Sequence, residues 1–274
     1  KDRAFRWTPG TGIAFLGDLP GGGDRSAGVG ISIDGSVLVG QGESSNGVEA
    51  FRWTAGTGMV GLGDLDGGDF YSVAAAVSSD GSVVVGSSRS HLGEEPFRWT
   101  EVGGMIGLGT LGESSIARAV SGDGSWVAGR GRITFGVEEA FLWSEATGLE
   151  PLGDLGGGLH FSDAYGVSGD GSTVVGDSDV DGGRIAFLWT RDDGMRSLRD
   201  VLIDEYGLDE LSGWTLESAF GISDDGNRIV GIGRNPQGGQ VGWLVTLHPI
   251  PERSSLSLLL AGLALLPVGR RRQS

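Results

Sequence analysis

Apolar and polar positions alternate in short runs along residues 49–88, and this pattern predicts β-strands. The runs SVAAAVS (72–78) and SVVVGSS (82–88) flank Asp80-Gly81. An Asp-Gly pair between two apolar runs is the strongest short-range signal for a β-hairpin. This part of the sequence therefore predicts two antiparallel strands joined by a tight turn.

Two further strands complete the pattern. In EAFRWT (49–54), Phe51 and Trp53 share one face of the predicted strand. After a turn, MVGLG (59–63) gives a fourth strand. The second strand, at residues 83–85, is apolar on both faces, so both of its faces need cover. A single four-stranded sheet cannot supply that cover, but stacking between copies of itself can.

The Phe-x-Trp pair of this unit recurs along the chain at spacings of 44 to 54 residues, and a weakened version ends the series. Such a period is typical of solenoids, propellers and repeat arrays. The repeated aromatic residues, which we expect to be structural, are Phe5, Trp7, Phe51, Trp53, Phe97, Trp99, Phe141, Trp143, Phe187, Trp189 and Trp243.

A second marker, an Asp-Gly pair, recurs in step with the Phe-x-Trp pair. Each Asp-Gly pair is followed, six residues after its Asp, by another glycine. The Asp residues are Asp34, Asp80, Asp123, Asp170 and Asp225. Four short strands per repeat with an aromatic residue at a fixed place predict an all-β fold, a β-propeller of four-stranded blades.

The repeats define the expected organisation. Residues 1–248 form one propeller domain, and residues 249–274 form a separate tail. Complete blades are expected at about 26–63, 71–109, 115–153 and 162–199, with partial blades at 4–17 and 216–247. The chain opens without a methionine inside a blade, so we expect a fragment or a processed form. Three more strands upstream would close a six-bladed ring, whereas a further whole repeat upstream would make the ring seven-bladed.

One link departs from the repeat. Between Trp189 and Trp243, apolar residues over 198–211 recur at roughly helical spacing. We predict one or two helical turns over Val201–Leu211, broken near Gly207. Either this insert covers the exposed side of the final blade, or it docks a partner.

The two ends of the predicted blades differ. The Asp-Gly turns are nearly uniform, as in SIDGS, SSDGS and SGDGS, and therefore indicate a structural role. The loops between the second and third strands vary, as in QGESSNGV, SSRSHLGEEP and DSDVDGGRI. We expect a ligand to bind at these variable loops, because loops on a rigid scaffold carry function.

Composition narrows the possible partners. The chain has 274 residues, 54 of them Gly, no Cys, and a net charge of −16. Without cysteine there is no disulfide framework and no thiolate metal site. The acidic balance argues against nucleic acid or an anionic membrane surface as a partner of the repeat domain.

The sequence shows little catalytic chemistry. His91, His160 and His248 fall at unrelated places in the repeat, and none has metal-ligand spacing. The run 179–182 resembles only the start of a calcium loop. We therefore expect no catalytic residue, no metal, no cofactor and no enzymatic activity. The alternative is a polysaccharide-active enzyme that uses acidic loop residues; a deep pocket with two facing acids of perturbed pKa would favour it.

The tail contains three unlike elements in order. Pro251 and Glu252 come first, then an almost wholly apolar run over 256–268, then Arg270, Arg271 and Arg272. The apolar run predicts a short hydrophobic helix, although a spanning helix needs about 20 residues. A basic cluster after an apolar run is typical of a cytoplasmic stop. A permanent tail anchor and a buried terminal helix are the other interpretations.

This order resembles the PEP-CTERM sorting signal. The resemblance implies export, recognition of Pro251 and Glu252 by an exosortase-like sorting protease or transpeptidase, and transient membrane contact through residues 256–268. The motif's second proline is Arg253 here.

The repeats resemble the HAF family of extracellular repeats, which carry His-Ala-Phe-x-Trp followed by Leu-Gly-x-Leu. This sequence has Ala50-Phe51-Arg52-Trp53 and Leu62-Gly63-Asp64-Leu65, with Glu49 in place of the histidine. The resemblance implies an exported, propeller-like protein at the cell surface or in the extracellular matrix of a bacterium. From the sequence we thus expect a non-catalytic binding module with an extracellular ligand, for which a polysaccharide is one candidate.

Overall fold

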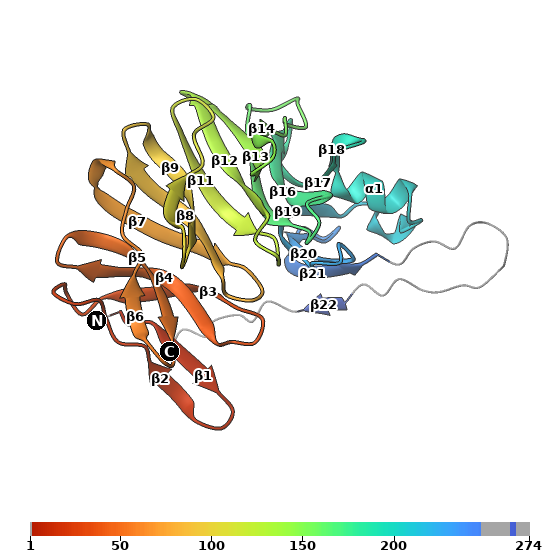
Figure 1. The fold of residues 1–274 in the computed structure, drawn as a ribbon. Coiled ribbons are helices and arrows are strands. Elements are labelled where there is room, and N and C mark those ends of the chain that lie inside the picture. Colours follow the sequence, from red (N-terminus) through yellow and green to blue (C-terminus); the bar gives the residue numbers. More distant parts are fainter. Residues whose placement is uncertain (1, 248–263, 267–274) are drawn as a thin grey trace. The chain divides into compact units, whose positions relative to one another are not determined.

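The computed structural model describes residues 2–247 and 264–266, and antiparallel β-strands dominate this part of the chain (Figure 1). The chain divides into two compact units. The first contains residues up to 135 together with 141–151, and the second contains 136–140 and the residues from 152 onward.

Within each group of four the strands pair in antiparallel order, and each group is named here as a numbered sheet; a single parallel pair, Val48↔Tyr71, joins the first two groups of four. The half-sheet comprises β1 (Phe5–Thr8) and β2 (Gly12–Phe15). Sheet 1 comprises β3 (Ser26–Ile31), β4 (Val37–Ser44), β5 (Gly47–Thr54) and β6 (Gly58–Gly61). Sheet 2 comprises β7 (Gly67–Val77), β8 (Val83–Ser90), β9 (Gly93–Thr100) and β10 (Gly104–Gly107).

The other sheets repeat this order. Sheet 3 comprises β11 (Ser114–Val120), β12 (Trp126–Thr134), β13 (Val137–Ser144) and β14 (Gly148–Pro151). Sheet 4 comprises β15 (Ser162–Val167), β16 (Thr173–Val180), β17 (Gly183–Thr190) and β18 (Gly194–Ser197). Sheet 5 comprises β19 (Thr215–Ile222), β20 (Arg228–Arg234), β21 (Gln240–Thr246) and β22 (Ala264–Leu266). The predicted four-stranded units are confirmed.

The glycine that follows each Asp-Gly turn is required by close packing. A Cβ atom on Gly86 would lie 2.0 Å from the carbonyl oxygen of Val73 and 2.9 Å from the ring of Phe97. Gly86 pairs with Phe97 across β8 and β9, just as Gly40 pairs with Phe51. The Phe ring of each repeat therefore lies over a glycine in the neighbouring strand, which explains why the two markers keep a fixed phase.

The turn itself also requires a glycine. Gly81 has φ +76°, a left-handed conformation that other residues adopt only with strain. A Cβ atom there would also lie 2.4 Å from a Val37 methyl group in sheet 1. The turn of one sheet is thus pressed against the strand of the sheet before it.

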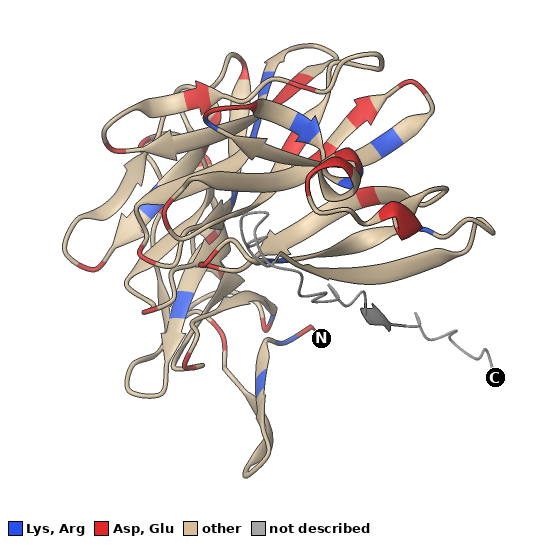
Figure 2. Ribbon diagram, turned by 90° about the vertical axis from the view of Figure 1, so that its right-hand side faces the viewer, with Lys and Arg blue, Asp and Glu red and all other residues tan. Residues whose placement is uncertain are grey.

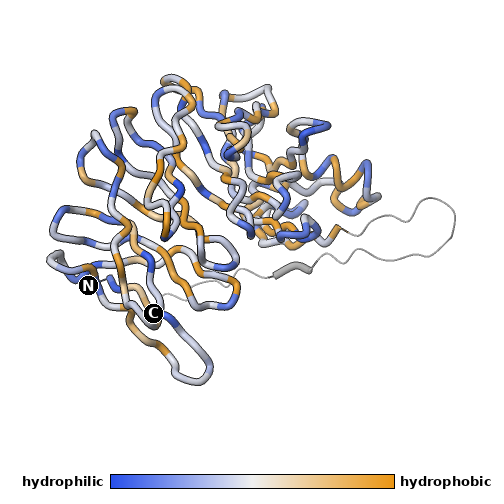
Figure 3. The backbone as a smooth tube through the Cα atoms, viewed as in Figure 1, coloured by the Kyte–Doolittle hydropathy of each residue, from blue (hydrophilic) through white to orange (hydrophobic). Residues whose placement is uncertain are grey.

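The hydrophobic cores lie between successive sheets. In the first unit, Val37, Val39 and Ala50 of sheet 1 pack with Val84 and Phe97 of sheet 2. Figure 3 shows hydrophobic positions distributed along the strands of both units. This arrangement buries both faces of the apolar strands, as stacking of copies requires.

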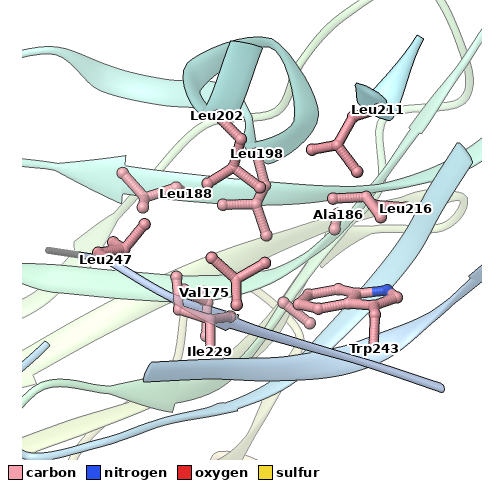
Figure 4. Close-up of a cluster of buried hydrophobic side chains, with 12 residues drawn as sticks. Val175, Ala186, Leu188, Leu198, Leu202, Leu211, Leu216, Ile229, Trp243 and Leu247 are labelled. Atoms are coloured by element: carbon pink, nitrogen blue, oxygen red, sulfur yellow. The ribbon is translucent and has the colours of Figure 1, made fainter. Parts of the chain in front are cut away.

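In the second unit, the insert supplies part of the core (Figure 4). Helix α1 (Leu198–Asp204) and the 3₁₀ turn η1 (Asp209–Leu211) confirm the predicted helical turns, with Gly207 between them at φ +68°. The helix starts three residues earlier than predicted because Ser197 caps it, accepting a hydrogen bond from the Asp200 N–H. The insert covers its sheets by burying side chains with them: Leu198, Leu202 and Leu211 lie among Val175, Leu188, Ile229 and Trp243.

The prediction of a hydrophobic helix over 256–268 is wrong for the three residues of this range that the structure describes. Ala264–Leu266 form strand β22, which pairs antiparallel with β21. The edge of β21 presents unpaired backbone groups, and an extended segment satisfies them where a helix cannot. Pro251, Glu252, Arg270, Arg271 and Arg272 lie outside the described residues.

Candidate functional site

At the uniform end of each sheet, side-chain hydrogen bonds hold the Asp-Gly turn in place. In sheet 2 the Asp80 carboxylate accepts hydrogen bonds from the Ser78 hydroxyl (2.7 Å) and the Ser82 N–H (2.9 Å). The Ser78 hydroxyl in turn accepts from the Val83 N–H at 2.9 Å. These donors lower the pKa of Asp80, and the same arrangement lowers the pKa of Asp34 to about 2.

Neighbouring sheets of the first unit are also joined at these turns. Arg52 Nε donates to the Gly81 carbonyl at 3.2 Å, and Arg98 Nε donates to the Gly124 carbonyl at 3.1 Å. The Ser79 N–H donates to the Gly122 carbonyl at 2.9 Å. The uniform residues at this end therefore hold neighbouring sheets together.

A second set of contacts, which the sequence analysis missed, explains the Ala-Phe-x-Trp and Leu-Gly motifs. The Ala50 N–H donates to Ser72 Oγ at 2.9 Å, and that hydroxyl donates to the Gly63 carbonyl. We call this arrangement a serine lock. It recurs at Ser26, with Ala4 and Gly17, and at Ser162, with Ala140 and Gly153. Serines at a constant distance after the alanine were the available signal.

Glu49, which precedes the Ala-Phe-x-Trp motif, belongs to the same region. A carboxylate oxygen of Glu49 accepts a hydrogen bond from the Gly63 N–H at 3.0 Å. Glu95 and Glu139 accept equivalently from Gly109 and Gly153, at 2.9 and 2.7 Å. The Glu at this position thus fixes the turn that leaves the fourth strand.

The repeated aromatic residues lie in three kinds of environment. Phe51, Phe97, Phe141 and Phe187 are fully buried, and Trp143, Trp189 and Trp243 are nearly so. Trp53 and Trp99 are partly buried. In the half-sheet, Phe5 is 55% exposed and Trp7 is 62% exposed.

At the variable end, sheet 4 carries a cluster of charged residues. Asp163 and Asp177 face each other across β15 and β16, and both are buried. Ser218 Oγ donates to Asp177 Oδ2 at 2.6 Å, whereas Oδ1 has no hydrogen-bond partner and lies 3.8 Å from Arg184 Nη1. Arg184 also donates to Asp179 at 3.2 Å.

Burial raises the pKa of Asp177 to about 6, and the neighbouring charges of Asp163 and Asp179 add to this effect. The hydrogen bond from Ser218 and the positive charge of Arg184 oppose it. Because the Asp177 side chain is only 2% exposed, the pair does not face solvent, and an open pocket with two facing acids is not formed here.

Aromatic residues accompany the charges at this end. The Arg184 guanidinium lies 4.2 Å from the centre of the Phe161 ring, and the Arg89 guanidinium of sheet 2 lies 4.9 Å from that of Tyr71. Arg89 also forms an ion pair with Asp69 at 3.5 Å. Both arrangements fall within the range of cation–π contacts.

The variable end of sheet 1 is hollowed. A cavity of about 410 Å³ is lined by Asp2, Arg25, Ser26, Ala27, Gln41, Gly42, Glu43 and Val48. Arg25 spans it, with ion pairs to Glu43 at 3.5 Å and to Asp2 at 3.9 Å. This volume falls in the range of small-ligand sites, and the lining offers both hydrogen-bond donors and acceptors.

Two further cavities lie in the second unit. One, of about 360 Å³, is at the uniform end, where Asp170, Asp193 and Asp225 approach Arg196 and Glu205. The other, of about 310 Å³, is lined in part by Asp181, Arg199 and Asp200. Figure 2 shows acidic residues spread over many strands and loops.

Among residues 2–247 and 264–266, no group of three or more His, Asp or Glu side chains is placed to hold a metal ion. Within the same residues, no helix has the length and apolar character needed to cross a membrane.

Comparison with known protein families and with curated protein sequences gives no match. Solved structures do match. The putative TolB of Agrobacterium tumefaciens is 14% identical with a TM-score of 0.53, and the match covers 89% of this chain and 86% of that chain. A puromycin-hydrolyzing peptidase of Mycobacterium tuberculosis is 17% identical with a TM-score of 0.54, and the match covers 92% of this chain and 43% of that chain.

A puromycin hydrolase variant is 18% identical with a TM-score of 0.52, and the match covers 89% of this chain and 40% of that chain. This chain therefore spans less than half the length of the two hydrolases. At these identities the likeness shows the fold alone: the chain has a β-propeller fold built from four-stranded blades.

We expected a protein without enzymatic activity, and that expectation is wrong. Structures with this fold include a puromycin-hydrolyzing peptidase and a puromycin hydrolase. The lack of a recognisable catalytic motif in the sequence was therefore not sufficient reason to exclude an enzyme. The same fold hosts proteins of different function, and at 17–18% identity it does not determine whether a chain is catalytic.

Proposed function

We propose that this protein is an exported β-propeller that binds an extracellular ligand, a polysaccharide by preference, at the variable ends of its blades. The supporting observation is the cavity of about 410 Å³ in sheet 1, where Arg25, Gln41 and Glu43 present polar groups. Hydroxyl-rich ligands are recognised by such planar, paired donors and acceptors. The uniform ends, in contrast, use their polar groups to join the sheets.

Binding would be tested by titrating the purified protein with a panel of bacterial polysaccharides, with analysis of the products to detect cleavage. Replacing both Gln41 and Glu43 by Ala should weaken binding about tenfold, since each lost hydrogen bond contributes about 0.5–1.5 kcal/mol. Glu101→Ala, in an exposed turn at the uniform end, is the matched control and should leave affinity unchanged. Equal binding by the double variant would refute the assignment of the site.

Export rests on the tail and on the resemblance of the repeats to HAF proteins. In this proposal an exosortase-like enzyme recognises Pro251 and Glu252, residues 256–268 contact the membrane transiently, and Arg270, Arg271 and Arg272 act as the basic stop. The protein is then held at the cell surface or released into the matrix.

Mass spectrometry of protein recovered from the cell surface tests this part. The expected C-terminus lies shortly after Glu252, and replacing the three arginines by Ala should leave the tail uncleaved. Surface protein that still ends at Ser274 would indicate a permanent anchor instead.

A further inference from the structure

The insert between sheets 4 and 5 lines a cavity at the uniform end as well as covering the core. Val201, Glu205 and Tyr206 of the insert lie there beside Asp170 of sheet 4 and Asp225 of sheet 5. The cavity has a volume of about 360 Å³, which is in the range of small-ligand sites. All of these residues belong to the second unit.

At two junctions of the first unit, an arginine occupies the corresponding place. The residue after the buried Phe of the third strand is Arg52 in sheet 1 and Arg98 in sheet 2. Arg52 Nε donates at 3.2 Å to the carbonyl of Gly81, the turn glycine of the next sheet. Arg98 Nε donates at 3.1 Å to the equivalent carbonyl of Gly124. A guanidinium group thus lies against the turn of the following sheet at both junctions.

Sheet 4 keeps this junction without the arginine. The Gly169 N–H donates to the Asp224 carbonyl at 2.8 Å, which is the counterpart of the contact between the turns of sheets 2 and 3. The residue after Phe187, however, is Leu188, which has no donor for the carbonyl of the turn glycine Gly226. Leu188 and Gly226 both line the cavity. The cavity therefore lies where the other two junctions place a guanidinium group.

The lining of this cavity carries more acids than bases. Its carboxylates are those of Asp170, Asp193, Glu205 and Asp225, and its cation is Arg196. Arg196 forms ion pairs with Asp193, at 2.9 Å, and with Glu205. The arginine of the cavity is thus bound to two of the four carboxylates.

The other two carboxylates belong to the Asp-Gly turns. The Ser172 N–H donates to Asp170 Oδ1 at 3.0 Å, and this bond is the main cause of the lowered pKa of Asp170. The Ser223 hydroxyl has the same effect on the pKa of Asp225, to which the charge of the exposed Arg228 adds a smaller contribution. Both turn carboxylates therefore carry their charge at neutral pH at the edge of the cavity.

The cavity also has an apolar wall. Leu188, Val201 and Leu247 line it, and all three are buried. Leu188 and Leu247 belong to the same core cluster of the second unit (Figure 4). A ligand with an alkyl chain next to its positive charge matches this combination of apolar wall and carboxylates.

We propose that this cavity binds an alkylguanidinium group, in the place that an arginine of the chain fills at the two junctions of the first unit. A guanidinium has five N–H donors, which serve the carboxylates of Asp170 and Asp225 and the Gly226 carbonyl. Carboxylates hold such a group through charge-assisted hydrogen bonds, and the alkyl chain lies on the apolar wall. This site is separate from the polysaccharide site proposed in sheet 1.

Calorimetry of the whole chain with butylguanidinium tests the proposal, and butylammonium is the matched ligand because it has the same alkyl chain and charge. We expect butylguanidinium to bind about tenfold more tightly, since its planar donors fit carboxylates better than an ammonium does. Absent binding of butylguanidinium, or equal binding of the two ligands, would overturn the proposal.

Two further ligands distinguish the sources of the group. They are agmatine and a tripeptide Gly-Arg-Gly with blocked termini. Tighter binding of the tripeptide supports an arginine side chain of a polypeptide, and tighter binding of agmatine supports a free small molecule.

Three variants locate the site. Asp170→Asn and Asp225→Asn keep an acceptor oxygen for the turn and remove the charge, so each should weaken binding about tenfold. Asp80→Asn makes the same change in sheet 2 and is the control, for which we expect unchanged affinity. Leu188→Arg supplies the guanidinium from the chain itself and should abolish binding while circular dichroism shows a folded protein. Unchanged binding in both Asp170→Asn and Asp225→Asn would overturn the proposal, whether or not Leu188→Arg folds.

Discussion

The two ends of each sheet use the same kinds of residue for different purposes. At the uniform end, Asp80 is exposed and accepts hydrogen bonds from its own turn, which lower its pKa. At the variable end, Asp177 is buried, has one oxygen without a hydrogen bond, and has a raised pKa. An aspartate therefore stabilises the fold where local donors surround it and opposes folding in its charged form where burial dominates.

Among the substitutions that test this comparison between the two ends, we expect removal of a serine lock to have the largest effect on stability. Ser72→Ala leaves the buried Ala50 N–H without its acceptor and the Gly63 carbonyl without its donor. We expect a loss of about 3 kcal/mol in the free energy of unfolding, since an unsatisfied buried group costs about 1–3 kcal/mol. Chemical denaturation measures this free energy of unfolding, with Ser45→Ala at an exposed position as the control. A loss below about 0.5 kcal/mol for Ser72→Ala would show that the serine lock does not stabilise the fold.

The next effect concerns pH. The folded-state pKa of Asp177, about 6, lies above its ordinary value of 3.8, so the folded protein binds this proton more tightly than the unfolded chain does. The contribution of Asp177 to stability is therefore greatest below about pH 4 and is lost as pH rises towards 6. Two pKa units correspond to about 2–3 kcal/mol.

Asp177→Asn removes this titration while keeping the shape of the side chain. Unfolding free energies of the wild type and the variant, measured from pH 4 to pH 7, should diverge in favour of the variant as pH rises. Asp181→Asn, at an exposed position in the loop after the same strand, is the control. Parallel pH profiles for the wild type and Asp177→Asn would show that the buried carboxyl does not titrate in this range.

The smallest effect belongs to the uniform end. Asp80→Ala removes the acceptor shared by Ser78 and Ser82, but the turn remains exposed to water, so we expect a loss of about 1 kcal/mol. Because the pKa of Asp80 is lowered, its contribution is present above about pH 4 and disappears as pH falls below that value. Glu101→Ala, at an exposed position in another turn of the uniform end, is the control for thermal unfolding.

The fold could be predicted from the sequence because its determinants are local. Asp80-Gly81 fixes a hairpin, and the alternation around Phe51 and Trp53 fixes a strand and its faces. The insert was recognisable from apolar spacing, whereas its first residue depended on the cap at Ser197.

The candidate site was less predictable because its determinants cross between repeats. Ser72 accepts a hydrogen bond from Ala50, 22 residues away, and Ser218 donates one to Asp177, 41 residues away. Nothing in the residue type of Asp177 indicates that it is buried, and nothing in the loop sequences indicates that Arg25 spans a cavity. The tail strand β22 escaped prediction because a leucine-rich segment has strong helical propensity, while the open edge of β21 decided its conformation.

Each serine lock joins the serine of one repeat to the alanine and glycine of the repeat before it. A duplicated gene segment of one period would therefore encode the residues of a new lock. At these three junctions a repeat could therefore be gained or lost during evolution with the contact preserved, and each added repeat would contribute a similar increment of stability.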